Sequence, residues 1–76
     1  MKLPSVERCP VTGGLKGSSA YAWCIFLCEE ADWIGDTFGY ARFRSIADIL
    51  EPKPGKPETA AFYSKDLEEA IEAWSR

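Results

Sequence analysis

The residues best suited to chemistry in this chain are its three cysteines and twelve acidic residues, because the sequence contains no histidine. A serine or cysteine nucleophile activated by histidine is therefore excluded. Paired carboxylates can act as general acid and base, and Glu29 with Glu30 and Asp32 with Asp36 lie close together in the sequence. We expect these pairs to lie in a wet, turn-like loop, so we interpret them as solvated charges and predict no catalytic residue.

The three cysteines raise the question of a metal site. Structural zinc sites usually need about four Cys or His ligands in closely spaced pairs. In a strand, Cys24 and Cys28 would share one face but stand about 13 Å apart, too far for one ion, and only a helix would bring them together. We predict that they are buried free thiols and that the chain holds no metal or cofactor. Cys9, in an expected loop, has only Arg8 beside it to lower its pKa.

Two features could contact phosphate. Gly13-Gly14 followed by Lys16 lacks the spacing of a phosphate-binding loop. Tyr40, Arg42 and Arg44 would share the exposed face of a strand over 40–44, where we favour pairing of the arginines with acids of a neighbouring strand. The net charge of −3 also argues against a nucleic-acid footprint.

The acidic residues form two sets and are the most informative charged feature. Residues 1–28 carry three basic residues and one acidic residue, whereas residues 29–76 carry eleven acidic and six basic ones. An acidic surface can simply keep a small domain in solution. It can also bind a basic partner, with Trp33, Ile34 and Phe38 as buried anchors inside an acidic rim. The partner-binding residues predicted on this basis are Glu29, Glu30, Asp32, Trp33, Asp36, Phe38, Glu68, Glu69 and Glu72.

The element expected to organise the core is residues 20–28, nine consecutive apolar residues. Its Tyr, Trp, Ile and Phe content favours a strand buried on both faces. A buried helix is the alternative. The shortness of the run and the negative charge of Glu29 and Glu30 at its end argue against a helix. We expect a loop over 29–39 and further strands over 40–44 and 59–63, with an edge strand near 5–11. Residues 51–57, with three prolines and a glycine, predict a loop.

The clearest element is a helix over 65–74. Its apolar residues recur at helical spacing: Leu67, Ala70, Ile71 and Trp74. Ser64 is a suitable N-cap. Glu68, Glu69 and Glu72 lie off the apolar face and should face water. Residues 45–50 fit a short helix that begins with a capping box, or a continuation of the preceding strand. The predicted fold is therefore α+β: one domain, residues 1–76, with a three- or four-stranded antiparallel sheet and the C-terminal helix packed on one face.

Two resemblances add to this reading. The stretch 62–74 is similar to the strand, cap and helix that end many small bacterial and phage domains, which supports the architecture alone. In size, acidity and lack of catalytic equipment, the chain resembles small phage-encoded inhibitors of the anti-CRISPR type. That resemblance implies a non-enzymatic inhibitor that occludes the nucleic-acid-binding surface of a basic partner such as a CRISPR effector complex.

This resemblance and the absence of an apolar leader or membrane-length run predict a protein of the bacterial cytoplasm, a monomer or weak dimer with no direct contact to nucleic acid or membrane. Two alternatives stay open. One is a small nucleic-acid-binding or regulatory domain that uses Tyr40, Arg42 and Arg44. The other is a structural accessory protein that forms oligomers.

Overall fold

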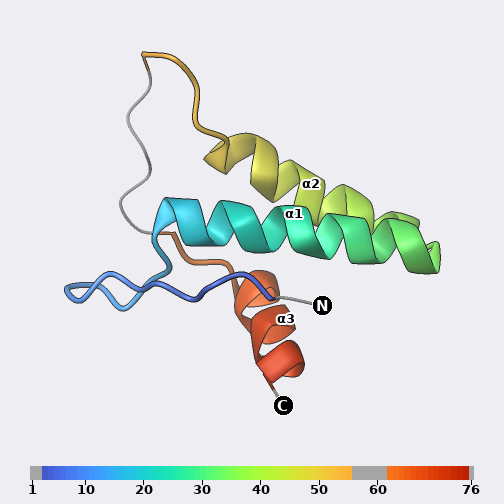
Figure 1. Ribbon diagram of the computed structural model, residues 1–76, viewed down its shortest axis with the longest axis horizontal. Coiled ribbons are helices and arrows are strands. Elements are labelled where there is room, and N and C mark those ends of the chain that lie inside the picture. The colour runs from blue at the N-terminus through green and yellow to red at the C-terminus, as the bar shows by residue number, and fades with distance from the viewer. Residues whose placement is uncertain (1–2, 56–61, 76) are drawn as a thin grey trace.

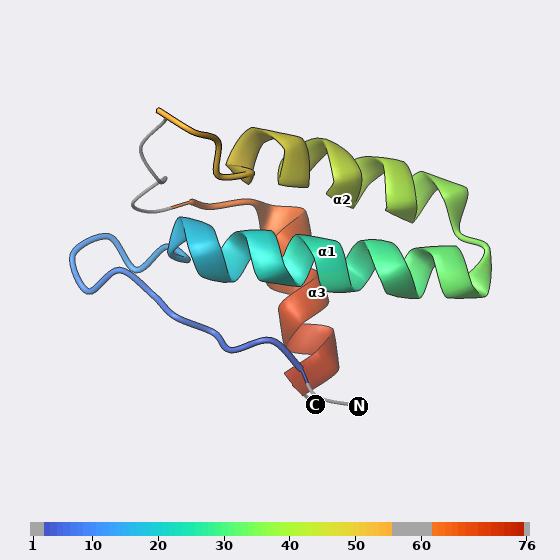
Figure 2. The ribbon, with the colours of Figure 1, turned by 45° about the horizontal axis from the view of Figure 1, so that its top comes forward.

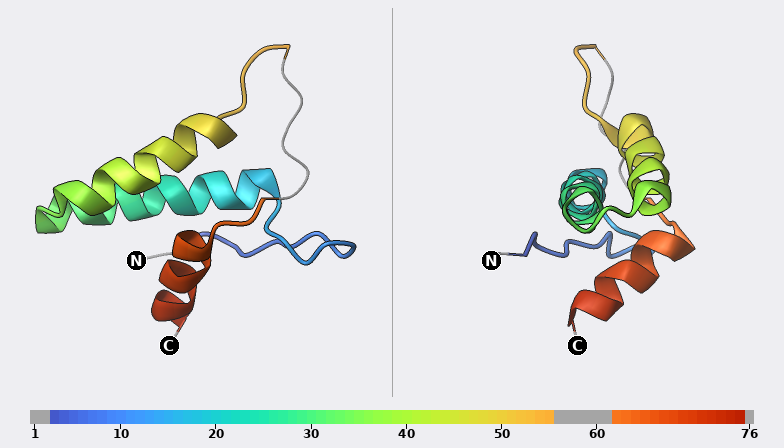
Figure 3. Two further views of the ribbon diagram at one scale, coloured as in Figure 1. Left: turned by 180° about the vertical axis from the view of Figure 1, so that it is seen from behind. Right: turned by 90° about the vertical axis from the view of Figure 1, so that its right-hand side faces the viewer.

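The computed structural model describes residues 3–55 and 62–75, and within these it contains three helices: α1 (Gly17–Ile34), α2 (Thr37–Leu50) and α3 (Lys65–Ser75). Helices α1 and α2 form an antiparallel hairpin, and α3 runs steeply across one face of this hairpin (Figure 1). The same arrangement is seen from behind and end-on in Figure 3. The expected α+β fold is wrong: the described residues form no sheet, only two isolated β-bridges.

Helix α1 contains the apolar run that was predicted to be a strand. Its buried apolar residues follow a helical repeat that was hidden because the residues between them are also apolar. They are Ala20, Trp23, Cys24, Leu27, Cys28 and Ala31. The intervening Tyr21, Ile25 and Phe26 are half-buried against the same core. An apolar surface this wide is stable on one helix because α2, α3 and the N-terminal segment each cover part of it (Figure 2).

A tight turn joins α1 to α2, where the sequence had led us to expect a long loop over 29–39. Glu29 and Glu30 lie inside α1, which continues to Ile34. Gly35 adopts the left-handed conformation, with φ of 78°, and the Gly35 and Asp36 amides donate to the carbonyls of Asp32 and Ala31. This is a Schellman ending, which favours glycine because a Cβ is strained at positive φ.

Helix α2 replaces the predicted strand over 40–44. The Asp36 carboxylate caps its N-terminus by accepting a hydrogen bond of 3.0 Å from the Gly39 amide. Phe43, Ile46, Ala47 and Leu50 recur at helical spacing and pack on the core. Ser45 does not begin a helix as a capping residue, since it lies inside α2 and its hydroxyl donates to the Ala41 carbonyl.

Helix α3 confirms the prediction over 65–74. The Leu67 amide donates to the Ser64 hydroxyl at 3.5 Å, a long contact in the geometry of an N-cap. Leu67 and Ile71 are buried against the core. Trp74 keeps 39% of its surface exposed and packs edge-on against Phe26, with ring centroids 5.2 Å apart.

The N-terminal segment runs beside α3 beneath α1 (Figure 2). The Ser19 hydroxyl fixes it there by donating to the Ser5 carbonyl and accepting from the Glu7 amide. Isolated antiparallel bridges join the fully buried Leu15 to Arg8 and to Phe62. The predicted edge strand over 5–11 is therefore reduced to a single bridge at Arg8. The predicted strand over 59–63 shows a single bridge at Phe62, and its residues 59–61 lie outside the described part.

The proline-rich stretch 51–57 is non-helical over residues 51–55, as predicted for a loop, and its residues 56–57 lie outside the described part. Among the described helices, none combines the length and the apolar character that crossing a bilayer requires.

Candidate functional site

The most distinctive surface lies at the turn of the helical hairpin, which we call the hairpin tip and define as Asp32, Trp33, Ile34, Asp36 and Phe38. The α1–α2 turn projects at one end of the molecule, away from α3 (Figure 1). Three large apolar side chains are exposed here: Trp33 by 86%, Ile34 by 71% and Phe38 by 83%. Single exposed apolar residues are ordinary, but an apolar group gathered at one projecting turn is typical of an interaction surface.

The hairpin tip is also strongly negative. No Lys or Arg occurs between Lys16 and Arg42 in the sequence, so α1 carries acidic residues and no basic one. Its last turn contains no basic residue to offset the negative end of the helix dipole. Within the described part of the chain, neither Asp32 nor Asp36 forms an ion pair. The exposed apolar group therefore lies beside acidic residues that pair with no basic residue of the described ranges.

A small cavity, which we call the tip cavity, opens between the end of α1 and the first turn of α2. Its volume is about 270 Å³. It is lined by two aspartates, one tyrosine and three small residues: Ala31, Asp32, Gly35, Asp36, Thr37 and Tyr40. Tyr40 is 43% exposed, so its side chain is partly accessible to solvent.

The structure separates the two predicted acidic sets. Glu29, Asp32 and Asp36 are exposed on the hairpin, and Glu30 is half-buried on α1. The second set is on α3, which crosses the middle of α1 rather than its end (Figure 1). The nine predicted residues therefore do not form one surface, and only the hairpin part combines acidic and apolar side chains.

Glu68 does not face water as predicted. Its carboxylate accepts two hydrogen bonds, of 2.9 and 2.7 Å, from the Arg8 guanidinium. The hydrogen bonds from Arg8 hold the pKa of the Glu68 carboxyl below its usual value. Glu69 and Glu72 are exposed on the same helix. Glu68 thus ties α3 to the N-terminal segment, and it is not available to a partner without breaking that contact.

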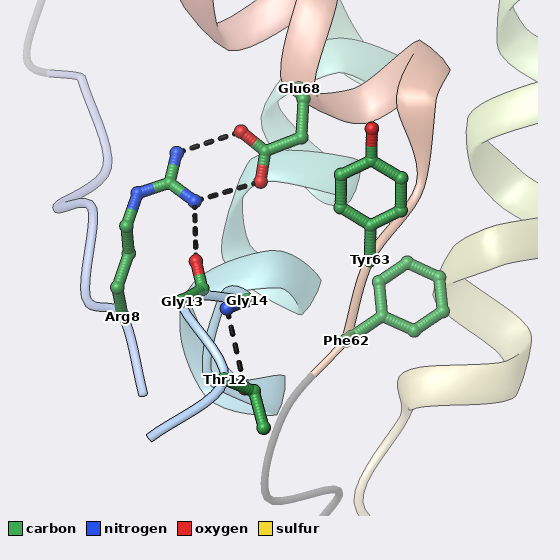
Figure 4. A pocket seen from close by; sticks show the side chains of 7 residues that line it. All are labelled: Arg8, Thr12, Gly13, Gly14, Phe62, Tyr63 and Glu68. Atoms are coloured by element: carbon green, nitrogen blue, oxygen red, sulfur yellow. Dashed lines mark hydrogen bonds and ion pairs between the residues drawn. The ribbon is translucent and has the colours of Figure 1, made fainter. Parts of the chain in front are cut away.

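The Arg8–Glu68 pair lines a second cavity of about 490 Å³, shown in Figure 4. Its other walls are Thr12, Gly13, Gly14, Phe62 and Tyr63. The guanidinium also donates to the Gly13 carbonyl at 3.1 Å. Its positive charge, which could otherwise attract an anion, is compensated by the Glu68 carboxylate. We interpret this network as a clamp between the N-terminal loop and α3.

The cysteines show no metal site. Burial raises the pKa of the Cys24 thiol to about 12 and also raises the pKa of the Cys28 thiol. Cys9 is half-buried, and the backbone amides of Thr12 and Val11 lower its pKa by hydrogen bonding to the sulfur. Nowhere in residues 3–55 and 62–75 do three or more Cys, Asp or Glu side chains gather closely enough to hold a metal ion.

Tyr40, Arg42 and Arg44 do not all share one face as a strand would have required: Arg42 is turned away, whereas Tyr40 and Arg44, four residues apart, lie on the same side of α2. Successive residues of a helix are rotated by about 100°, which turns Arg42 away from Arg44. Arg42 lies 3.8 Å from the Asp66 carboxylate of α3, and Arg44 lies 3.3 Å from Asp48 one turn along α2. The predicted pairing across strands is therefore wrong, and the arginines pair with acids within α2 and between α2 and α3.

Sequence reasoning did not assign Tyr40 to the acidic set, because a strand would have placed it with the arginines. One sequence signal points to Tyr40: the stretch 17–41 contains no basic residue. Every residue that lines the tip cavity falls within this stretch. Comparisons with protein-family models, with curated proteins and with solved structures found no match to this chain. The function must therefore be argued from the geometry.

Proposed function

We propose that this protein is a non-enzymatic binding protein that docks its hairpin tip on a basic surface of a partner protein. The observation that carries the proposal is the exposure of Trp33, Ile34 and Phe38 beside carboxylates that form no ion pair within the described part of the chain. Large aromatic side chains supply most of the affinity at interfaces when they enter pockets on the partner. The acidic surround favours a positively charged partner and speeds its association.

Proteins that handle nucleic acid present such surfaces, because their channels are lined by Lys and Arg that neutralise phosphates. A compact acidic protein seated in such a channel would exclude the nucleic acid by steric and electrostatic occlusion. We therefore propose an inhibitor of the anti-CRISPR type, acting in the cytoplasm of a bacterial host on an effector complex.

The two alternatives have less support. A nucleic-acid-binding role for Arg42 and Arg44 is weakened by their pairing with Asp66 and Asp48. Self-association through the hairpin tip would bring the carboxylates of two copies together, which repels them. A single copy acting on a basic partner fits the charge distribution better.

The test uses purified CRISPR effector complexes and the intact protein. Binding of guide-matched target DNA by each complex is followed by gel mobility with increasing amounts of protein. A complex that the protein inhibits is then tested with Trp33→Ala/Phe38→Ala, and with Ile49→Ala as a control, because Ile49 is a 61% exposed apolar residue at the other end of α2. We expect the tip variant to lose inhibition and the control to keep it.

Charge is tested separately by Asp32→Lys, with Glu69→Lys on α3 as the matched control. Reversal at the hairpin tip should slow association by about tenfold or more at low salt, and the control should change it little. Full inhibition by both tip variants would contradict the proposal, as would a complete lack of inhibition of every effector complex tested.

A further inference from the structure

We infer that the tip cavity receives an arginine side chain of the partner, held between Asp32 and Asp36 and against the ring of Tyr40. This inference rests on the proposed function, because it names the partner group that the hairpin tip would bind. Glu69 and Glu72 of α3 also border a cavity, but Arg8 and Lys65 line that cavity too. Only acidic residues contribute charge to the lining of the tip cavity, so the proposal concerns this position on the surface.

The shape of the tip cavity fits the end of one long side chain. Its volume of about 270 Å³ is just below the range of about 300–1,000 Å³ that holds whole small molecules. Ala31, Gly35 and Thr37 leave this space open because none has a long side chain. A flat guanidinium can enter such a space edge-first.

The two carboxylates can accept hydrogen bonds from the guanidinium. One oxygen of Asp36 accepts from the Gly39 amide, and the side chain lies over Gly39, whose missing Cβ would be only 2.9 Å from the Asp36 carboxyl carbon. Asp32 forms no ion pair within the described residues. Arginine has five donors in a rigid planar fork, so one group can bond to two carboxylates at once.

The local field also favours a cation. The negative end of the α1 dipole points toward the turn, and no basic residue lies in the last turn of α1. The positive end of α2 begins at the same turn, but the Asp36 side chain caps it. An entering cation is therefore attracted by α1 and Asp32 while α2 offers it little repulsion.

Tyr40 distinguishes arginine from lysine. A guanidinium can stack flat on an aromatic ring, whereas an ammonium is a compact and strongly hydrated charge. The exposed Trp33 and Phe38 lie in the two helices that border the tip cavity. The matching feature on the partner is an arginine with apolar neighbours.

The test is an NMR titration of the intact, ¹⁵N-labelled protein with a capped tripeptide that has arginine between two leucines. The same peptide with citrulline, a neutral isostere, is the control, and a third peptide contains lysine. We expect amide shifts confined to residues 31–40, with a Kd on the order of 1 mM, as befits so small a ligand. The arginine peptide should bind at least about threefold more tightly than the other two.

Three variants identify the groups involved. Asp32→Asn and Asp36→Asn each remove one charge, and asparagine keeps the helix cap at position 36; each should raise the Kd about threefold. Tyr40→Leu should remove the preference for arginine over lysine. Glu69→Gln on α3 is the matched control and should leave the Kd unchanged.

Equal binding of the arginine and citrulline peptides, or shifts spread over α3, would overturn the inference. These results separate it from the proposed function. If Trp33→Ala/Phe38→Ala abolishes inhibition while no peptide binds in the tip cavity, the hairpin tip docks through apolar contacts alone. If the arginine peptide binds but no effector complex is inhibited, the arginine site stands and the proposed partner is wrong.

Discussion

Substitution by alanine should destabilise the protein far less at Trp33 than at Trp23, the other tryptophan of α1. Trp33 is 86% exposed and Trp23 only 1%. A tryptophan side chain buries up to about 250 Å², so Trp33, with about a seventh of its surface covered, contributes about 0.9 kcal/mol at most at 25 cal/mol per Å². Trp33→Ala should therefore lower the free energy of unfolding by less than about 1 kcal/mol. Trp23→Ala empties a core position, which costs about 3–5 kcal/mol.

Urea unfolding followed by circular dichroism measures both changes. A domain of this length has a total stability of about 4–11 kcal/mol, so Trp23→Ala consumes a large part of it or unfolds the protein. A loss above about 1.5 kcal/mol for Trp33→Ala would show that its ring is packed in the free protein. That result would refute its placement on an open surface, and the proposed interface would lose its central anchor.

Three other predictions concern the clamp, the thiols and the N-terminal segment. Glu68→Gln should lower stability by about 0.2–1 kcal/mol at pH 7, since both side chains of its ion pair with Arg8 are partly exposed. Folding lowers the pKa of Glu68. The difference in free energy of unfolding between the unsubstituted protein and this variant should therefore be fully present above the unfolded pKa of about 4.3 and vanish as pH falls through the folded pKa. Chemical denaturation at several pH values measures this difference. In native protein a thiol reagent should modify Cys9 quickly and the two buried thiols of α1 only after unfolding; rapid reaction of all three thiols would contradict the packing. Ser19→Ala should cost about 1–2 kcal/mol because it leaves two backbone groups without their partner, and hydrogen exchange at the Glu7 amide should accelerate; an unchanged rate there would show that another group protects it.

The sequence allowed α3 to be predicted but not α1 and α2, for a physical reason. In α3 only Leu67 and Ile71 are buried, so apolar and polar residues separate cleanly around the helix. In α1 several neighbours cover different sides, and apolar residues occur at nearly every position. A continuous apolar run shows no alternation of apolar and polar residues that would distinguish a helix from a strand. The aromatic residues in the run then favoured a strand, which is wrong.

The error in α2 has another origin. Tyr40, Arg42 and Arg44 alternate with Ala41 and Phe43, which is the period of a strand over a window of only five residues. The helical spacing of Phe43, Ile46, Ala47 and Leu50 is visible only over a longer window.

Part of the candidate site was nevertheless accessible from sequence. The combination of acidic residues with Trp33 and Phe38 was predicted to bind a partner, and the structure places the two aromatic side chains, both exposed, at one projecting turn. The tip cavity could not be predicted, because it depends on bringing Asp32 and Tyr40 together across a turn that was expected to be a long loop.

The two-residue connection between α1 and α2 has a consequence for the order in which the protein opens. Contacts within the hairpin are local in sequence and form early, whereas docking of α3 must close a longer chain segment first. Native-state hydrogen exchange should therefore show α3 and the N-terminal segment opening as one unit before the hairpin does. The hairpin tip belongs to the part that opens last, so the binding surface would remain presented through such fluctuations.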